Sequence, residues 1–209
     1  MKWIKFLTIN NIPYYIYKIK KEDSIIISNI KNNNNIIIIL CGLAYLTQVF
    51  TNQELLPVAI LDKNKILFSE AKKQQIYHKL VALDTTYVLS LDEFTLKRSS
   101  LSVVLGIHLL ESYKQTIHKY ELTNTIISQK YIKNRILQLI FTICLQFGEI
   151  KNQKILIPFH LSQKNIAILT GTSKNSVSKV MKKISKMNII KDLDKKMIYI
   201  NNILQLNLK

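Results

Sequence analysis

Residues 161–190 read LSQKNIAILTGTSKNSVSKVMKKISKMNII, and this stretch decides the fold of the C-terminal part of the chain. Ser162 precedes an apolar turn, and its hydroxyl can cap a first helix. Gly171 suits the positive φ of a tight turn between two helices. Ser173 can cap the second helix in the same way. The inner face of that second helix is expected to carry Val177, Val180 or Met181, and Ile184. The stretch therefore predicts a helix-turn-helix.

The outer face of the predicted second helix is basic, because helical spacing places its polar residues opposite the apolar ones. The helix contains no acid, so a polyanion is the simplest compensating partner, and a solvated basic face is the alternative. Side chains near the start of such a helix reach base edges in the major groove. The candidates for base readout are Lys174, Asn175, Ser178 and Lys179. The candidates for phosphate contacts are Gln163, Ser173, Ser176, Lys182, Lys195 and Lys196.

The flanks of this stretch add further elements. Ile189–Leu193 and Met197–Asn201 alternate apolar and polar residues around a turn, which predicts a hairpin. Lys154–Phe159 predicts a short strand before the helices. Tyr131–Phe147 predicts another helix, which Gly148 is expected to end in the left-handed conformation. Helix, strand, helix, turn, helix and hairpin in that order predict a winged helix-turn-helix.

A long helix is expected upstream, over residues 99–130. Its seam residues recur at alternating spacings of three and four, which is the heptad pattern. They are Val103, Gly106, Leu110, Tyr113, Ile117, Tyr120, Asn124 and Ile127. A core helix is one interpretation of this stripe. The narrowness of the stripe favours the other, a dimer seam in which Asn124 helps to fix the register.

The first 98 residues predict β structure. Runs rich in Ile, Val, Leu, Thr and Tyr are separated by turn clusters, at the near-regular spacing of a compact β-sandwich or roll. The runs are Ser24–Ile30, Ile36–Phe50, Leu55–Leu61 and Leu80–Ser90. We therefore expect an α+β protein in three parts: a β domain over residues 1–98, a dimerisation helix over 99–130, and a DNA-binding domain over 131–209.

Charge is distributed unevenly along the chain. The 209 residues include 30 basic and 13 acidic side chains, a formal net charge of +17. Residues 1–130 hold 16 basic and 10 acidic residues, whereas residues 131–209 hold 14 basic and 3 acidic residues. No acid occurs between Glu149 and Asp192. A uniform codon bias would not remove acids from one segment, so the asymmetry indicates double-stranded DNA as the partner of the C-terminal part.

The composition also indicates where the protein is made. The chain has 35 Ile, 28 Lys and 18 Asn but only 2 Arg, which follows codons rich in A and T. Such usage suits a small AT-rich genome, such as that of an organelle or a reduced bacterium. Apolar runs are shorter than the roughly 20 residues that span a bilayer, and the start of the chain lacks a secretory signal. We therefore expect an intracellular protein with no membrane partner.

The sequence does not predict an enzyme or a metal site. It has no glycine-rich phosphate loop, Walker lysine loop or nucleophile elbow. Cys41 and Cys144 lie in apolar runs and are expected to be buried thiols. Metal-ligand spacing is absent among the four histidines, which are His78, His108, His118 and His160.

The quoted stretch resembles the helix-turn-helix signature of the CRP/FNR regulators. Leu-Ser, the Ile-Ala step, Gly-x-Ser, Val-x-basic and the closing Asn-Ile-Ile keep the spacing of that signature. Within the family, Ile136–Gly148 and Ile76-Tyr77-His78 look most like the nitrogen regulator NtcA. The resemblance implies a cyclic-nucleotide-binding-like β-roll and a homodimer on a palindromic operator. It also implies contact with RNA polymerase and a nitrogen-control role. A plastid-encoded regulator of this kind would explain the AT-rich composition, so the resemblance implies a plastid protein, with the bacterial cytoplasm as the alternative. The alternative is a constitutive nucleic-acid-binding protein whose β domain only dimerises.

The resemblance also marks where this chain departs from the family. Family members place Arg where Lys174 and Lys179 stand, and Lys lacks the bidentate fork that reads guanine, so we expect weaker discrimination. An effector site would include Gln75, Tyr77 and Glu121. Gln75 stands where the family has Arg, and the preceding segment has no Gly. The dianion 2-oxoglutarate and cyclic AMP would each lose their best partner, so we expect no cofactor and weak effector control.

Overall fold

The computed structural model describes residues 3–27, 35–68, 76–92, 102–151, 154–186, 190–193 and 197–201. The chain divides into two compact units, Met1–Leu122 and Thr123–Lys209. The long helix α3 (Ser102–Ile127) contributes residues to both units.

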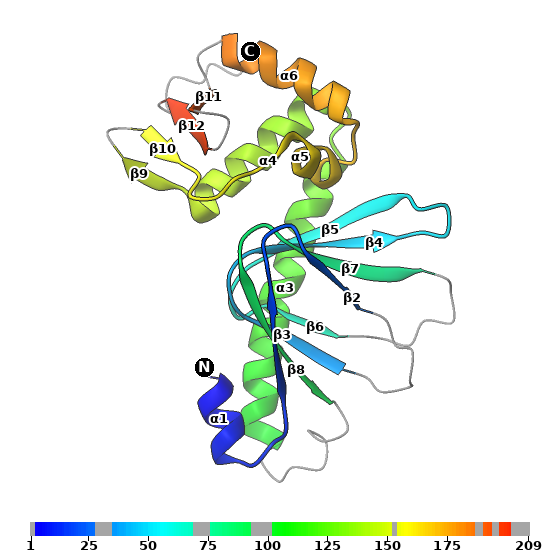
Figure 1. Cartoon of the computed structure of the whole chain (residues 1–209), viewed down its shortest axis with the longest axis vertical. Coiled ribbons are helices and arrows are strands. Elements are labelled where there is room, and N and C mark those ends of the chain that lie inside the picture. The colour runs from blue at the N-terminus through cyan, green and yellow to red at the C-terminus, as the bar shows by residue number, and fades with distance from the viewer. Residues whose placement is uncertain are drawn as a thin grey trace. The chain divides into compact units, whose positions relative to one another are not determined.

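The first unit is an antiparallel β-roll with two helices (Figure 1). Its elements before α3 are α1 (Trp3–Ile9), β1 (Tyr15–Ile19), β2 (Ser24–Ile27), β3 (Asn35–Cys41), β4 (Ala44–Val49), β5 (Leu55–Leu61), β6 (Ile66–Phe68), β7 (Tyr77–Ala82) and β8 (Thr86–Asp92). One sheet has the strand order β1-β8-β3-β6, and the other has the order β2-β7-β4-β5. Most neighbours in a sheet are far apart in sequence, so the chain passes between the two sheets several times.

Strand β3 is apolar on both faces because both faces are buried. Ile37 and Ile39 belong to the core between the two sheets, which includes residues of both sheets. Ile36 and Ile38 belong to a second core on the other face of the same sheet. That second core is covered by α1 and α3, through Trp3, Leu7 and Leu105. The predicted run of isoleucines is therefore a strand without a solvent face.

Thr116 anchors α3 to β6. Its side chain is fully buried. Its Oγ1 accepts a hydrogen bond from the amide of Ile66 at 2.9 Å and donates one to the carbonyl of Ser112 at 3.1 Å. The strand amide therefore has its partner on the helix, where an unpaired buried amide would cost about 1–3 kcal/mol.

Charged side chains make a second anchor beside Thr116. Asp62 Oδ1, in the turn between β5 and β6, lies 3.2 Å from Lys65 Nζ and 3.3 Å from Lys119 Nζ. Lys65 Nζ also donates to Gln115 Oε1 at 3.2 Å. Burial lowers the pKa of Lys119, and the neighbouring Asp62 acts in the opposite direction. These contacts determine which face of α3 meets the roll.

Two of the predicted strand runs are split in the structure. Gly42 ends the first strand of the run Ile36–Phe50, because its φ of 97° lies in the left-handed region. A Cβ atom there would also meet the backbone of Thr86. The run Leu80–Ser90 is split into β7 and β8 by a turn at residues 83–85. Helix α1 was not predicted.

One expectation about side-chain burial is wrong. Cys41 is exposed, because it ends β3 after a register shift between Ile39 and Cys41. Tyr120 of the predicted heptad stripe packs against the core between the sheets, as the core-helix interpretation predicts for this residue, and burial raises its pKa to about 12. The other thiol, Cys144, is buried as expected.

The second unit contains the end of α3, three further helices and one sheet (Figure 1). Its elements after α3 are α4 (Ile132–Phe147), β9 (Glu149–Lys151), β10 (Lys154–Leu156), α5 (Gln163–Leu169), α6 (Lys174–Lys186), β11 (Ile190–Leu193) and β12 (Met197–Asn201). The strands form an antiparallel sheet in the order β11-β12-β10-β9. The predicted hairpin is present, and β9, which was not predicted, adds an edge strand.

Gly148 follows α4, but the expected left-handed conformation is wrong. Its φ is −69°, which other residues also adopt. A Cβ atom at this position would meet the carbonyl oxygen of Cys144 and the side chain of Ile155. Gly148 is therefore needed because neighbouring atoms leave no room for a side chain, and its backbone conformation would allow other residues.

The predicted fold class is confirmed: the protein is α+β, with an antiparallel β-roll, a long helix and a winged helix-turn-helix. Among the residues described, no helix combines the length and apolarity needed to cross a membrane.

We predict that the two thiols differ sharply in reactivity. Burial raises the pKa of Cys144 to about 12, so its reactive thiolate is almost absent near neutral pH, whereas Cys41 is exposed. A colorimetric disulfide reagent should modify one thiol in the native protein and both after denaturation. Cys41→Ser should abolish the native reaction. Rapid modification of Cys144 in the native Cys41→Ser protein would contradict the buried position.

Candidate nucleic-acid interface

Helices α5 and α6 and their connection form the predicted helix-turn-helix (Figure 1). Ser162 caps α5 as predicted, since its Oγ accepts the amide of Asn165 at 3.1 Å. Gly171 has a φ of 59°, as predicted for the turn. The amide of Thr172 donates to the carbonyl of Ala167 at 2.9 Å, which closes the turn. Local hydrogen bonds therefore hold the angle between the two helices.

Helix α6 separates buried and exposed residues cleanly. Val177 and Ile184 are fully buried, and Val180 and Met181 are half-buried. Asn175, Lys179, Lys182 and Lys186 lie on the opposite side at helical spacing, and all are exposed. The apolar face holds α6 on the unit, while the basic face is available to a partner.

Charge on this face has no compensation within the two helices. Neither α5 nor α6 contains Asp or Glu. The nearest acid upstream in sequence, Glu149 of β9, pairs with Lys151 at 2.8 Å. An acid-free helix with several exposed lysines creates a positive surface that suits a phosphate backbone.

The residues predicted to read bases all belong to α6. Lys174, Asn175 and Lys179 are exposed, and Ser178 is half-buried. All four fall in the first two turns of the helix, where side chains reach the floor of a groove. The structure brings these residues onto one helix end, and their contact with bases stays a prediction.

The residues predicted to bind phosphate are spread over more of the unit. Gln163 and Lys182 are exposed on α5 and α6. Ser173 Oγ accepts the amide of Ser176 at 3.2 Å, and the two hydroxyls lie 2.9 Å apart. Ser173 therefore caps α6, as predicted. Lys195 and Lys196 lie outside the described residues.

Arg135 is a positioning residue that the helix-turn-helix pattern did not indicate. Its Nε donates to the carbonyl of Gln129 at 2.7 Å, and its Nη1 lies 3.5 Å from the carbonyl of Thr170. Thr170 is the C-cap of α5, where a cation is favourable. Arg135 thus joins the start of α4 to the turn before α6. The available signal was its rarity, because Arg occurs twice in this Lys-rich chain.

The predicted effector residues are not gathered by any contact shown for them. Gln75 lies outside the described residues. Tyr77 begins β7 and is half-buried, on the strand face opposite Leu80 of the inter-sheet core. Glu121 is exposed on α3, with its carboxylate 3.5 Å from His118 Nδ1. Their role in effector binding stays a prediction. In the described part of the chain, no group of three or more His, Cys, Asp or Glu could hold a metal ion.

Comparisons with known proteins agree with this geometry. Residues 134–208 match the family model of the Crp-like helix-turn-helix domain. A relative from Porphyra purpurea, described as an HTH-type transcriptional regulator and named ycf28, is 27% identical over 202 residues. That match covers 94% of this chain and 82% of the relative.

Solved structures show the same fold over almost the whole chain. A cyclic nucleotide-binding domain containing protein of Listeria monocytogenes matches with a TM-score of 0.73 and 15% identity, covering 95% of this chain and 97% of that chain. A CRP-family transcriptional regulator of Thermus thermophilus matches with a TM-score of 0.71 and 14% identity, covering 89% and 92%.

The second unit is thus a winged helix-turn-helix DNA-binding domain of the Crp-like type. Together with the β-roll and the long helix, it gives the chain the same order of parts as the CRP-family structure, and the chain is similar to the HTH-type transcriptional regulator of Porphyra purpurea over most of its length.

We predict that Arg135 stabilises the helix-turn-helix. Arg135→Met removes a charged donor from two carbonyl groups, so local opening of α5 and α6 should become easier by about 1–3 kcal/mol. Hydrogen exchange of peptides covering residues 163–186 measures this loss of protection. The exposed Lys133, on the same helix, supplies the control Lys133→Met. Equal protection in both variants would show that Arg135 does not hold the turn.

Proposed function

We propose that the protein is a CRP/FNR-type transcriptional regulator that binds a two-fold-related DNA site as a homodimer, with α6 of each protomer in the major groove. The observation that carries the proposal is the exposed basic face of α6, a helix that contains no acidic residue. The opposite face is held on the unit by the buried Val177 and Ile184. Two such helices on one symmetric dimer would meet two half-sites about one helical turn of DNA apart.

Within α6, we assign base readout to the N-terminal residues and backbone contacts to others. Lys174, Asn175, Ser178 and Lys179 would face base edges. Lysine donates as a point charge and lacks the planar fork of arginine, so a guanine preference would be weaker than with Arg at the same positions.

We assign phosphate contacts to Gln163, Ser173, Ser176, Lys182, Lys195 and Lys196. The geometry refines two of these. Because the hydroxyls of Ser173 and Ser176 share one hydrogen bond, one of the two protons is engaged and the other can be donated to a phosphate oxygen. The two serines would therefore supply a single hydroxyl donor between them.

We assign the dimer contact to an apolar stripe on α3. Val103, Ile107, Leu110, Tyr113 and Ile117 are between 38% and 72% exposed, although all are large and apolar. The stripe adds Ile107 to the predicted heptad seam and leaves out Tyr120, which packs against the core between the sheets. The opposite stripe of α3, which includes Leu105 and Thr116, packs on the roll. A second copy of α3 is the occupant that covers this stripe symmetrically.

We further propose that the protein is plastid-encoded and controls genes of nitrogen metabolism, acting through contact with RNA polymerase. The usage of Ile, Lys and Asn supports the plastid, as does the likeness to the regulator of Porphyra purpurea. The resemblance of Ile76–His78 and Ile136–Gly148 to the nitrogen regulator NtcA supports the physiological role.

We predict that two lysines of α6 differ in what they contribute to binding. Lys179→Ala should weaken operator binding by about 1–3 kcal/mol and relax the preference at one base pair. Lys182→Ala should weaken all duplexes alike and reduce the salt slope by about one unit. Fluorescence anisotropy with operator and random duplexes over a salt series measures both. Identical, sequence-independent losses in the two variants would show that α6 does not read bases.

We predict that charges in the α3 stripe abolish the dimer. Leu110→Glu with Ile117→Glu should give a monomer in sedimentation and abolish tight operator binding, because a half-site loses the linked second contact. Glu111→Lys with His118→Lys changes two exposed positions outside the stripe and should leave the dimer intact. A wild-type protein that sediments as a monomer at micromolar concentration would contradict the seam.

A further inference from the structure

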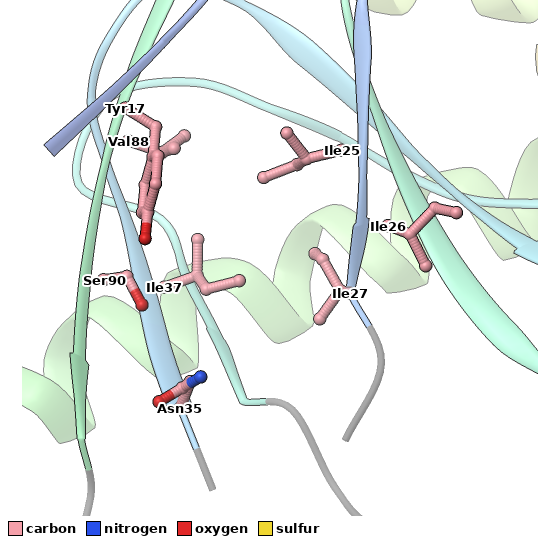
Figure 2. Close-up of a pocket in the computed structure, with 8 residues that line it drawn as sticks. All are labelled: Tyr17, Ile25, Ile26, Ile27, Asn35, Ile37, Val88 and Ser90. Carbon is pink, nitrogen blue, oxygen red and sulfur yellow. The ribbon is translucent and has the colours of Figure 1, made fainter. Parts of the chain in front are cut away.

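A cavity of about 250 Å³ lies in the β-roll, lined by residues of β1, β2, β3 and β8 (Figure 2). Tyr77 and Glu121, the described members of the predicted effector site, are not among the described residues that line it. The cavity is therefore a different place in the roll from the site implied by family resemblance.

Strand register explains one wall of the cavity. Tyr17 of β1 is opposite Val88 of β8, and Ser90 of β8 is opposite Ile37 of β3. Because side chains alternate along a strand, these four share one face of their sheet. Val88 and Ile37 belong to the core between the sheets, so this face looks into the roll.

The facing wall comes from β2. Ile25 and Ile27 are two residues apart and share a face of that strand. Ile27 is buried in the core between the sheets, and Ile25 packs against the same core. In Figure 2 these two side chains lie across the cavity from Ile37 and Val88. Four apolar side chains from two sheets therefore enclose the cavity.

The hydrogen-bonding side chains among the described lining residues all belong to one sheet. Tyr17 and Ser90 carry hydroxyls, and Asn35 of β3 carries a side-chain amide. Figure 2 shows both hydroxyl oxygen atoms on the side of the cavity formed by β1 and β8. Tyr17 is 50% exposed, so the cavity reaches solvent beside its ring.

The lining defines the chemistry of an occupant. None of the described lining residues is charged. Among the described lining residues, a buried carboxylate or phosphate would find no cation to pair with, which makes a dianion unfavourable there. An uncharged, mainly apolar molecule with one hydrogen-bonding group would match both the aliphatic and the polar side chains of the lining.

We propose that this cavity binds a small uncharged molecule with an apolar body and one hydroxyl or carbonyl group that hydrogen-bonds to Tyr17 or Ser90. At about 30 Å³ for each water, the volume corresponds to about eight waters, which is the size of a single substituted ring. The proposal is independent of the DNA-binding function.

The test uses the full chain and 4-fluorophenol, which is uncharged near neutral pH and is observed by fluorine NMR. We expect saturable binding with a Kd on the order of 0.1–1 mM, as suits a ligand of this size. The matched anion 4-fluorobenzoate should bind roughly tenfold more weakly or worse. Absence of saturable binding, or benzoate binding as tightly as the phenol, would overturn the proposal.

Variants of the lining residues test whether the ligand binds in this cavity. Ile25→Phe fills it and should weaken binding roughly tenfold or more. The double variant Tyr17→Phe, Ser90→Ala removes both hydroxyls and should weaken binding roughly threefold to tenfold. Ile16→Phe changes a 44% exposed residue on the other face of β1 and should leave the Kd unchanged. Should Ile25→Phe fail to fold, the double variant decides alone, because it adds no volume. A Kd unaffected by the double variant in that case, or by both changes when both proteins fold, would overturn the proposal.

Discussion

The side chains of β3 pack into two cores at once, and the first unit is organised around this arrangement. Ile37 and Ile39 close the space between the two sheets, while Ile36 and Ile38 form the floor on which α1 and α3 lie. A polar residue at any of these positions would lack both water and a partner. The strand therefore forces a layer of helices onto the outer face of its sheet, and α3 supplies most of that layer along with α1.

Polar anchors then decide the rotation of α3 about its own axis. Thr116 bonds to the amide of Ile66, and Lys119 reaches Asp62. With these residues turned towards the roll, the stripe containing Leu110 and Ile117 is left in solvent. Within the described residues the stripe stays exposed although it is apolar, and this is the reason for proposing a second copy of α3 as its partner.

The two units differ in the charge of their candidate binding surfaces. On α6, lysines without acidic neighbours are held outwards by Val177 and Ile184, which suits a partner that carries many negative charges. The described lining of the cavity in the roll consists of aliphatic side chains, two hydroxyls and one amide, which suits the uncharged ligand that we propose. A ligand of the roll and the DNA would therefore be recognised by unrelated physical means.

Local patterns in the sequence determined much of this protein, since each depends on residues a few positions apart. The sequence alone predicted the capping roles of Ser162 and Ser173, the positive φ of Gly171 and the basic helix without acidic residues. Contacts between distant residues could not be predicted in this way. Only the tertiary structure decided that Cys41 is exposed, that Gly148 is needed for close packing, and that Arg135 reaches Thr170. Burial and close approach depend on which surfaces meet, and periodicity along one element does not specify its neighbours.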